Sequence, residues 1–248
     1  MEVRVVGTGE AFDSGVGNNA FLLDAAGGAT LLVDCGYQIP ERLWARGLHR
    51  GIDAIYLTHT HADHAFGLVP LLTRYWEERR RRALTIIGHG GVRSFVGKAL
   101  DLGFPGIAAR FAFPIEFVAV RPGRPLSWRG LTLDTARSRH GVTNLSVRFT
   151  AGGRSCAFSG DGGITEDTAA LYAGVDTLFH ELFATRRDVP GHTNLTALKR
   201  LVDRIRPARV VVSHHGRRYK DGVRRAVAKL GPAPTEWVSA EPDQTFVI

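Results

Sequence analysis

Short apolar runs separated by turns dominate the first 60 residues, and they predict strands. Residues 1–10 alternate apolar and polar positions and then turn, and the runs 19–24 and 30–36 flank a hairpin-like turn, AAGGA. A short helix is expected at 39–47. The apolar run 53–58 predicts a buried strand that leads directly into a histidine-rich segment.

Helical spacing of apolar residues first appears at 64–82, which predicts a helix ending in the arginine run 79–82, and it recurs at 92–103 and 194–207. Further strands are expected at 84–88, 114–120, 131–136, 144–151, 154–161, 176–180 and 208–215. Strands come first and alternating strands and helices follow, and this order occurs twice. It predicts two sheets packed together with helices outside. No linker or repeat interrupts the pattern, so we expect a single domain over 1–248.

Composition indicates the cellular compartment more clearly than it indicates the function. The net charge of +8 permits an anionic partner such as nucleic acid or a phosphorylated substrate. We interpret Arg79 to Arg82, however, as a solvated helix end, where arginines favour the helix dipole. Cys35 and Cys156 lie in apolar runs, which favours a reduced cytoplasm over a disulfide scaffold. The chain begins directly with a strand and has no long apolar run, so neither a signal peptide nor a membrane helix is expected.

The segment LTHTHADHAFG, residues 57–67, concentrates imidazole and carboxylate in one short turn. Side chains two apart in a strand share a face, so His59 and His61 can reach one metal ion together. Asp63 and His64 lie past the turn and suit a second ion. Zinc and similar ions take these ligands, and their catalytic sites keep a position open for water. The string therefore predicts a metal site directly after a buried strand.

Other strand ends supply further candidates. His140 lies in SRHGVTN between two strands, Asp161 follows a buried run in AFSGDGG, and His214 and His215 follow another in VVVSHHG. Taken singly, each is more typical of a turn residue or a satisfied core group. Their recurrence at the ends of buried strands instead favours a cleft that binds two ions.

Together these motifs resemble the metallo-β-lactamase-fold hydrolases, and within them the ribonuclease Z-like branch. VVGTGEAF and LLVDCG match its opening pattern, THTHADH its metal string, HGVTN and VSHHGRRY the contexts of later histidine ligands, and SGD its bridging aspartate. FHELFAT and GHTN are altered forms of two further signatures. The resemblance spans essentially the whole chain. It implies an α/β fold, a four-layer αββα sandwich of two mixed sheets with helices outside, and a homodimer.

Carried over residue by residue, the resemblance assigns seven side chains to two divalent ions: His59, His61 and His140 to one, Asp63, His64 and His214 to the other, and Asp161 to both. The ions are expected to be Zn²⁺, with Mn²⁺ or Fe²⁺ as alternatives that accept the same ligands. Asp34 would orient the ligand loop, or else is a strand-end turn residue. His215 is expected to support or pack beside the site, with a ligand role in place of His214 as the alternative.

The resemblance also implies a mechanism. Two ions share a hydroxide and polarise the substrate oxygen, and Asp63 accepts the proton of the attacking water. His192 in GHTN is the candidate proton donor to the leaving oxygen, oriented by Glu181. The alternatives are that His192 is only a neighbour of the helix capped by Asn194, and that His180 or Glu181 is structural.

The leading hypothesis is therefore a binuclear metal-dependent phosphodiesterase acting on a small or nucleotide-like phosphodiester through a metal-bridging hydroxide. Members that process transfer-RNA 3′ ends carry a long arm between the third histidine motif and the bridging aspartate. Here His140 and Asp161 are 21 positions apart, which disfavours a tRNA 3′-processing endoribonuclease. Further alternatives are a lactone or thioester hydrolase of the same fold, a nucleic-acid-binding protein with a structural metal site, and a mono-iron oxygen-using relative.

Overall fold

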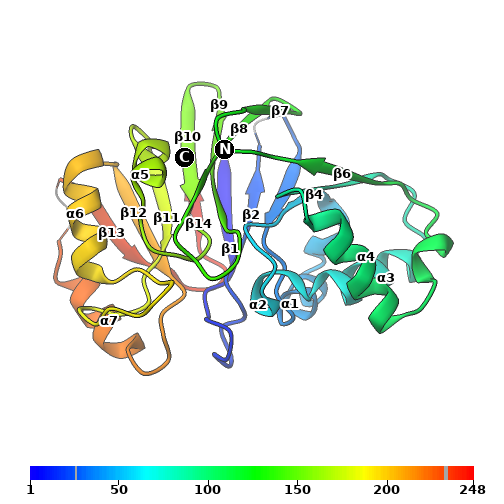
Figure 1. Ribbon diagram of the computed structural model, residues 1–248, viewed down its shortest axis with the longest axis horizontal. Helices are drawn as coiled ribbons and strands as arrows, with labels where there is room; N and C mark the ends of the chain where they lie inside the picture. The colour runs from blue at the N-terminus through cyan, green and yellow to red at the C-terminus, as the bar shows by residue number, and fades with distance from the viewer. Residues whose placement is uncertain (26, 232–233) are drawn as a thin grey trace.

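Two β-sheets pack face to face, and helices cover their outer faces (Figure 1). The structure is a computed structural model that describes residues 1–25, 27–231 and 234–248. Within these residues the first sheet has seven strands in the order β14 (Thr245–Val247), β1 (Glu2–Gly7), β2 (Ala20–Asp24), β3 (Thr30–Val33), β4 (Ile52–Tyr56), β5 (Leu84–Gly88) and β6 (Ile115–Ala119). The second has seven in the order β13 (Glu236–Ser239), β12 (Arg209–Ser213), β11 (Thr177–Glu181), β10 (Arg154–Phe158), β9 (Leu145–Ala151), β8 (Leu131–Arg137) and β7 (Leu126–Trp128).

Both sheets are mixed. β1, β2 and β3 pair antiparallel, whereas β3, β4, β5 and β6 pair parallel. In the second sheet β7 to β10 pair antiparallel and β10 to β13 pair parallel. The parallel strands need crossover connections, and helices supply most of them. This topology brings the carboxyl ends of the parallel strands to one edge of each sheet, where ligands bind in open α/β sheets.

The helices form the two outer layers. The first sheet carries α1 (Ile39–Ala45), α2 (Ala62–Ala65), α3 (Leu68–Glu77) and α4 (Val92–Gly103), with 3-10 turns η1 (Leu48–Gly51) and η2 (Ile107–Arg110). The second carries α5 (Glu166–Tyr172), α6 (Leu195–Ile205) and α7 (Lys220–Ala228). In Figure 1 α3 and α4 lie at one side of the molecule and α6 and α7 at the other. The predicted four-layer αββα sandwich is confirmed.

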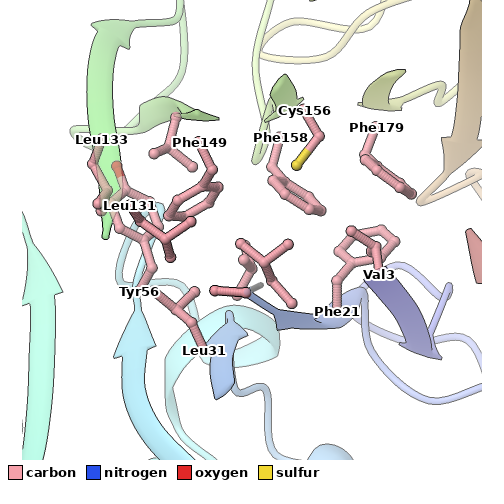
Figure 2. Close-up of a cluster of buried hydrophobic side chains, with 14 of the residues drawn as sticks. Val3, Phe21, Leu31, Tyr56, Leu131, Leu133, Phe149, Cys156, Phe158 and Phe179 are labelled. Carbon is pink, nitrogen blue, oxygen red and sulfur yellow. The ribbon is translucent and has the colours of Figure 1, made fainter. Parts of the chain in front are cut away.

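Aromatic rings fill the space between the sheets (Figure 2). Phe158 and Phe179 extend from the second sheet and stack at 4.7 Å between ring centroids. Phe21 from the first sheet lies against both, at 5.1 and 5.2 Å. Tyr56 contacts Phe149 across the same interface at 6.0 Å. Close-packed interiors prevent two sheets from sliding past each other. The strand ends of both sheets therefore hold their polar residues in fixed relative positions.

The expected helix at 64–82 is wrong in its extent. The chain forms α2 and then α3, which begins at Leu68 and ends at Glu77. Gly67 lies between them, where a Cβ would collide with the backbone oxygens of Cys35 and Gly36. This close approach between distant segments interrupts the helix.

The arginine run consequently follows the helix and does not form its last turn. Arg80 folds back, donates to the carbonyl oxygens of Ile52 and Ala83, and places its guanidinium 4.5 Å from the ring centroid of Tyr75. Arg82 pairs with Asp53 at 3.2 Å. Two of the four arginines thus anchor a turn, while Arg79 and Arg81 are exposed.

The hairpin predicted at the N-terminus is confirmed by the antiparallel pairing of β2 and β3, although Ala26 in its turn lies outside the described residues. The short strand β7 was not predicted. Among the helices of the described ranges, none has the length and apolar character needed to cross a membrane.

Candidate metal centre

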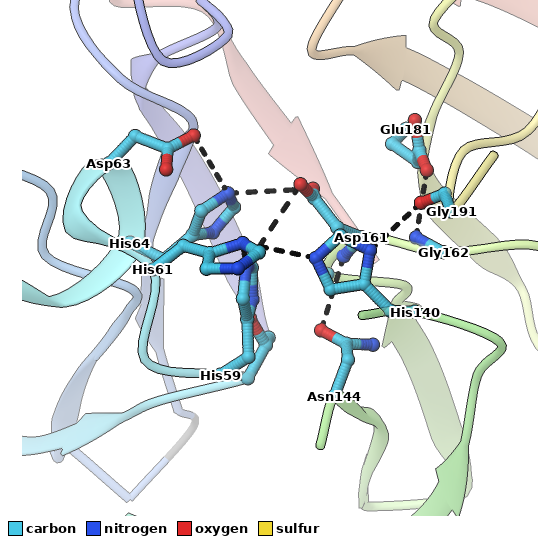
Figure 3. Close-up of polar contacts among 12 residues, drawn as sticks. His59, His61, Asp63, His64, His140, Asn144, Asp161, Gly162, Glu181 and Gly191 are labelled. Atoms are coloured by element: carbon cyan, nitrogen blue, oxygen red, sulfur yellow. Dashed lines mark hydrogen bonds and ion pairs between the residues drawn. The ribbon is translucent and has the colours of Figure 1, made fainter. Parts of the chain in front are cut away.

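The structure brings the seven predicted ligands together in one cluster. Figure 3 labels all of them except His214. Four come from the segment that follows β4, and Asp161 and His214 follow β10 and β12. His140 comes from the loop between β8 and β9. By position and chemistry the cluster divides into two groups.

His59, His61 and His140 form the three-histidine group. Nδ1 of His61 lies 3.2 Å from Nε2 of His59 and 3.1 Å from Nε2 of His140. Zinc–nitrogen bonds of about 2.0–2.1 Å in tetrahedral geometry separate neighbouring nitrogens by about 3.3 Å. The three nitrogens therefore have the spacing of ligands around a common centre.

Hydrogen bonds orient these rings. Thr58 Oγ1 donates to Asp34 and so accepts from Nδ1 of His59, at 3.0 Å. His140 Nδ1 donates to the carbonyl oxygen of Gly191 at 2.8 Å. In both rings Nε2 is left with its lone pair facing the group. Burial lowers the pKa of His59 well below its usual value and also lowers the pKa of His61. Both imidazoles are therefore neutral and can offer a nitrogen lone pair to a metal ion.

Asp63, His64, Asp161 and His214 form the two-aspartate group, and all four are buried. His64 Nε2 lies 3.4 Å from Asp63 Oδ2 and 3.4 Å from Asp161 Oδ1. His214 Nε2 lies 3.4 Å from Asp63 Oδ2 and 3.5 Å from Asp161 Oδ2. Two imidazole nitrogens and two carboxylates thus surround one point, a donor set that suits zinc and related divalent ions.

The two-aspartate group attracts positive charge. Burial alone would lower the pKa of His214, but Asp161 and Asp63 outweigh it and raise that pKa to about 9. Burial likewise opposes protonation of His64, yet Asp161 and Asp34 raise its pKa well above the usual value. Nε2 of His64 and Oδ1 of Asp161 are both buried without a hydrogen-bond partner among the described residues. Such atoms are costly to bury, and a cation between them would satisfy both, so the residues fit a divalent ion.

Asp161 faces both groups. Its Oδ2 lies 3.5 Å from His214 Nε2 and 4.0 Å from Nε2 of His59, which belongs to the three-histidine group. Burial raises the pKa of Asp161, but His214 and His64 hold it well below the usual range, so it is ionised. No other carboxylate of the described cluster is shared in this way.

The turn that carries Asp161 is tightly enclosed. Its backbone N–H donates to Asn144 Oδ1 at 3.1 Å, and its carbonyl oxygen accepts from Ser138 Oγ at 2.6 Å. Gly160 and Gly162 flank it with φ values of 59° and 128°, and a Cβ on either would collide with those same two side chains. The close approach of the β8–β9 loop thus requires a glycine on each side of Asp161.

Asp34 lies behind the groups. Its carboxylate accepts from the Thr58 backbone N–H at 2.8 Å, from Thr58 Oγ1 at 2.8 Å and from Nδ1 of His64 at 2.7 Å. Asp34 thereby supports one ring in each group: His64 directly and His59 through the threonine. Its φ of 61° also makes it a turn residue, so both interpretations of this position describe part of its role.

His192 lies beside the cluster with Glu181 behind it. Its Nδ1 is 3.2 Å from each carboxylate oxygen of Glu181, which also accepts from the backbone N–H of Gly162 at 2.8 Å. The ring centroid of His192 is 5.7 Å from those of His140 and His214. Burial lowers the pKa of His192, but the Glu181 carboxylate outweighs it and raises that pKa above the usual value.

Glu181, His192 and His214 also offer ligand atoms within 4.8 Å of one another. Spacing alone therefore permits His192 to act either as a proton donor or as a ligand. The hydrogen bond from Nδ1 to Glu181 leaves Nε2 as the reactive atom in both cases.

His215 and His180, which neighbour site residues in the sequence, form hydrogen bonds outside the cluster. His215 donates from Nδ1 to the carbonyl oxygen of Leu182 at 2.9 Å, and its Nε2 lies 3.0 Å from Ser239 Oγ. The structure thus places His214 in the two-aspartate group and His215 outside it. His180 donates to the carbonyl oxygen of Glu181 at 2.7 Å and belongs to the core.

The supporting residues Thr58, Ser138 and Asn144 were not predicted. Two of them had a sequence signal, because Thr58 precedes the histidine string and Asn144 ends the HGVTN motif. Phe183, whose ring stacks on His192 at 4.2 Å, was also missed.

Comparison with known proteins agrees with this geometry. An Anti-Pycsar protein Apyc1 from Bacillus phage 010DV004 is 46% identical over 69 residues, which are 27% of this chain and 27% of that protein. A Ribonuclease Z from Staphylococcus carnosus is 28% identical over 156 residues, which are 61% of this chain and 50% of that protein. These matches span about a quarter and a half of the relatives' own lengths.

Among solved structures, the metallo-beta-lactamase fold protein YhfI from Bacillus subtilis superposes with a TM-score of 0.83 at 20% identity, over 99% of this chain and 98% of that chain. The protein therefore has the metallo-β-lactamase fold and resembles the ribonuclease Z-like branch. A family model described as Anti-Pycsar protein Apyc1 matches residues 1–230, which is most of the sequence. The chain belongs to the Anti-Pycsar protein Apyc1 family.

Proposed function

We propose that the protein is a metal-dependent phosphodiesterase that hydrolyses a small or nucleotide-like phosphodiester. The observation that carries this proposal is the position of the Glu181–His192 pair beside both ligand groups. A hydrolase that releases an alkoxide needs a proton donor next to its metal centre, and this pair is suited to that task. The relatives named Ribonuclease Z support a phosphodiester as the bond that is cleaved.

In this proposal the three-histidine group would hold one divalent ion and the two-aspartate group the second, and Asp161 faces both groups. When bound, such ions acidify water and polarise a phosphoryl oxygen. Burial raises the pKa of Asp63, but His214 and His64 hold it well below the usual range. Asp63 is therefore ionised at neutral pH, which is the form that can accept a proton from the attacking water.

His192 completes the reaction at the other side of the phosphorus. Glu181 engages Nδ1, so the Nε2–H of the imidazolium is directed away from Glu181 and donates its proton as the bond from phosphorus to the leaving oxygen breaks. The raised pKa of His192 keeps the donor form populated near neutral pH.

The β9–β10 hairpin favours a small substrate. The 21 positions from His140 to Asp161 are taken up by these two paired strands and their turn. No long insertion projects from this segment of the described chain. The segment that grips RNA in the tRNA-processing branch therefore has no counterpart at this position.

A substrate panel tests the proposal. Purified protein loaded with zinc or manganese is assayed on bis-p-nitrophenyl phosphate, an acyl lactone and a thioester. We expect turnover of the diester that a chelator abolishes and added metal restores, with little turnover of the acyl substrates. Asp203→Asn, an exposed change in α6, is the matched control. Hydrolysis of the lactone or thioester without turnover of the diester would overturn the proposal in favour of an acyl hydrolase.

A further inference from the structure

A pocket of 420 Å³ is lined in part by Phe183, whose ring stacks on His192. Three segments line it: Glu10 and Phe12, residues 187–190 with Phe183, and residues 216–219. The volume lies in the range of about 300–1,000 Å³ that is usual for small-molecule sites. We call it the Phe12 pocket.

Phe183 connects this pocket to the candidate active site. Its ring stacks on His192 at 4.2 Å and 20°, and the same ring lines the pocket. Gly216, two residues after His214, donates its backbone N–H to the carbonyl oxygen of Phe183. A Cβ at Gly216 would lie 2.6 Å from that ring, so the glycine allows the ring to lie flat against the turn. Tyr219 packs edge-on against Phe183 at 6.2 Å.

Phe12 forms the outer wall and is 70% exposed. The Arg217 guanidinium lies 5.5 Å from its ring centroid, and Arg217 Nε pairs with Glu10 at 2.6 Å. Glu10 also accepts the backbone N–H of Phe12 at 3.2 Å. An exposed ring held by neighbouring contacts and backed by an arginine is the arrangement on which proteins stack nucleic-acid bases.

The pocket also carries positive charge. Arg187 and Arg218 line it, and among the described residues neither has a carboxylate within 4 Å. The carboxylate of Asp188 is engaged by the Asn194 side chain at 2.7 Å. Unneutralised arginines beside aromatic rings attract an anionic ligand that has a planar part.

We infer that the Phe12 pocket binds the base and sugar of a nucleotide-like diester while its phosphate lies at the metal centre. This inference rests on the proposed function and adds the residues that recognise the substrate. The base stacks on Phe12 or Tyr219, and Arg218 contacts the nucleotide from the rim. Phe183 links base binding to the position of His192.

Two esters with the same leaving group test this inference: thymidine 5′-(p-nitrophenyl phosphate) and methyl p-nitrophenyl phosphate. Wild type should prefer the nucleoside ester. Phe12→Ala should raise KM for that ester by about tenfold, the usual scale for losing one base–aromatic stack, and change KM for the methyl ester much less. Arg218→Gln should shift KM in the same direction. Phe104→Ala, at an aromatic residue that is 47% exposed in a different part of the chain, and Arg200→Gln are the matched controls.

Binding of adenosine 5′-monophosphate to the metal-loaded protein gives a second readout that needs no turnover. Calorimetric titration should show a Kd about tenfold weaker in Phe12→Ala than in wild type and Phe104→Ala. Equal Kd values in all three proteins, or equal KM changes for both esters, would overturn the inference. Failure of wild type to hydrolyse either ester would count against the proposed function, while the binding experiment still decides the role of the pocket.

Discussion

Each of the two ligand groups takes two side chains from the same short segment, residues 59–64, yet the groups differ in carboxylate content and in burial. The three-histidine group contains no carboxylate, burial lowers the pKa of His59 and of His61, and His61 and His140 are only half-buried. The two-aspartate group is buried throughout and contains two carboxylates that raise the pKa of His64 and of His214. One group therefore offers imidazoles near the surface, whereas the other is an enclosed site that contains two carboxylates.

Local backbone structure explains this difference. His61 is still extended, with ψ of 155°, whereas Asp63 and His64 lie in the first turn of α2. The change from strand to helix turns the second pair toward β12 and His214. A cation in the two-aspartate group gains direct attraction to carboxylates in a buried setting, so we expect it to be held more firmly than one in the three-histidine group.

Asp161→Ala should have the largest effect, because it removes the one side chain that faces both groups. We expect turnover to fall by well over 100-fold, since losing a group that merely orients a ligand already costs about 10- to 100-fold. Elemental analysis should show weaker retention of both ions. Loss of a single ion, with the other unaffected, would show that Asp161 belongs to one group only. Asp203→Ala is the control.

His192→Ala tests whether chemistry separates from metal binding. If His192 protonates the leaving oxygen, kcat on an alkyl ester should fall by about 10²–10⁴-fold, the usual contribution of general acid catalysis. A p-nitrophenyl ester needs little protonation and should be much less affected, while metal content stays constant. Glu181→Gln should show the same pattern more weakly. Loss of metal from the His192 variant would instead show that His192 is a metal ligand, together with Glu181 and His214.

Asp34→Asn should weaken metal binding in both groups, but by different amounts. The carboxylate bonds directly to His64 but reaches His59 only through Thr58. We expect affinity for the ion of the two-aspartate group to fall by about 10- to 100-fold, with a smaller change at the three-histidine group. Competition with a chromogenic chelator measures both. Equal weakening of the two ions would show that Asp34 supports the whole loop and not one ring.

The smallest effect concerns His215, beside the two-aspartate group. Burial lowers its pKa to about 4, against about 6.5 in an unfolded chain. The folded ring is neutral, and the unfolded chain takes up a proton as pH falls below about 6.5, so the free energy of unfolding decreases toward acid. His215 should account for about 2 kcal/mol of the loss between pH 7.5 and pH 5. Urea unfolding at both pH values should show a smaller loss in His215→Gln, and an unchanged loss would contradict this.

The convergence of the seven predicted ligands could be foreseen because each lies at a strand end or in a turn next to one. His59 to His64, Asp161 and His214 follow apolar runs, and parallel strands bring such ends to one edge. The aromatic residues that pack between the sheets sit in the same runs.

Features set by contacts between distant segments could not be foreseen. The break at Gly67 depends on the backbone of Cys35 and Gly36, and Arg80 folds onto Tyr75 because the chain turns there. The Phe12 pocket joins residues 10 and 12 to two segments that lie more than 170 positions later, 183–190 and 216–219. Local periodicity carries no information about any of these contacts.

Metal stoichiometry tests the central claim most directly, namely that the two groups hold separate ions. Elemental analysis after mild dialysis should find close to two divalent ions per chain in wild type. His61→Ala removes one side chain of the three-histidine group and should retain close to one ion, in the buried two-aspartate group. A wild-type stoichiometry that never exceeds one, even with added metal, would contradict the account.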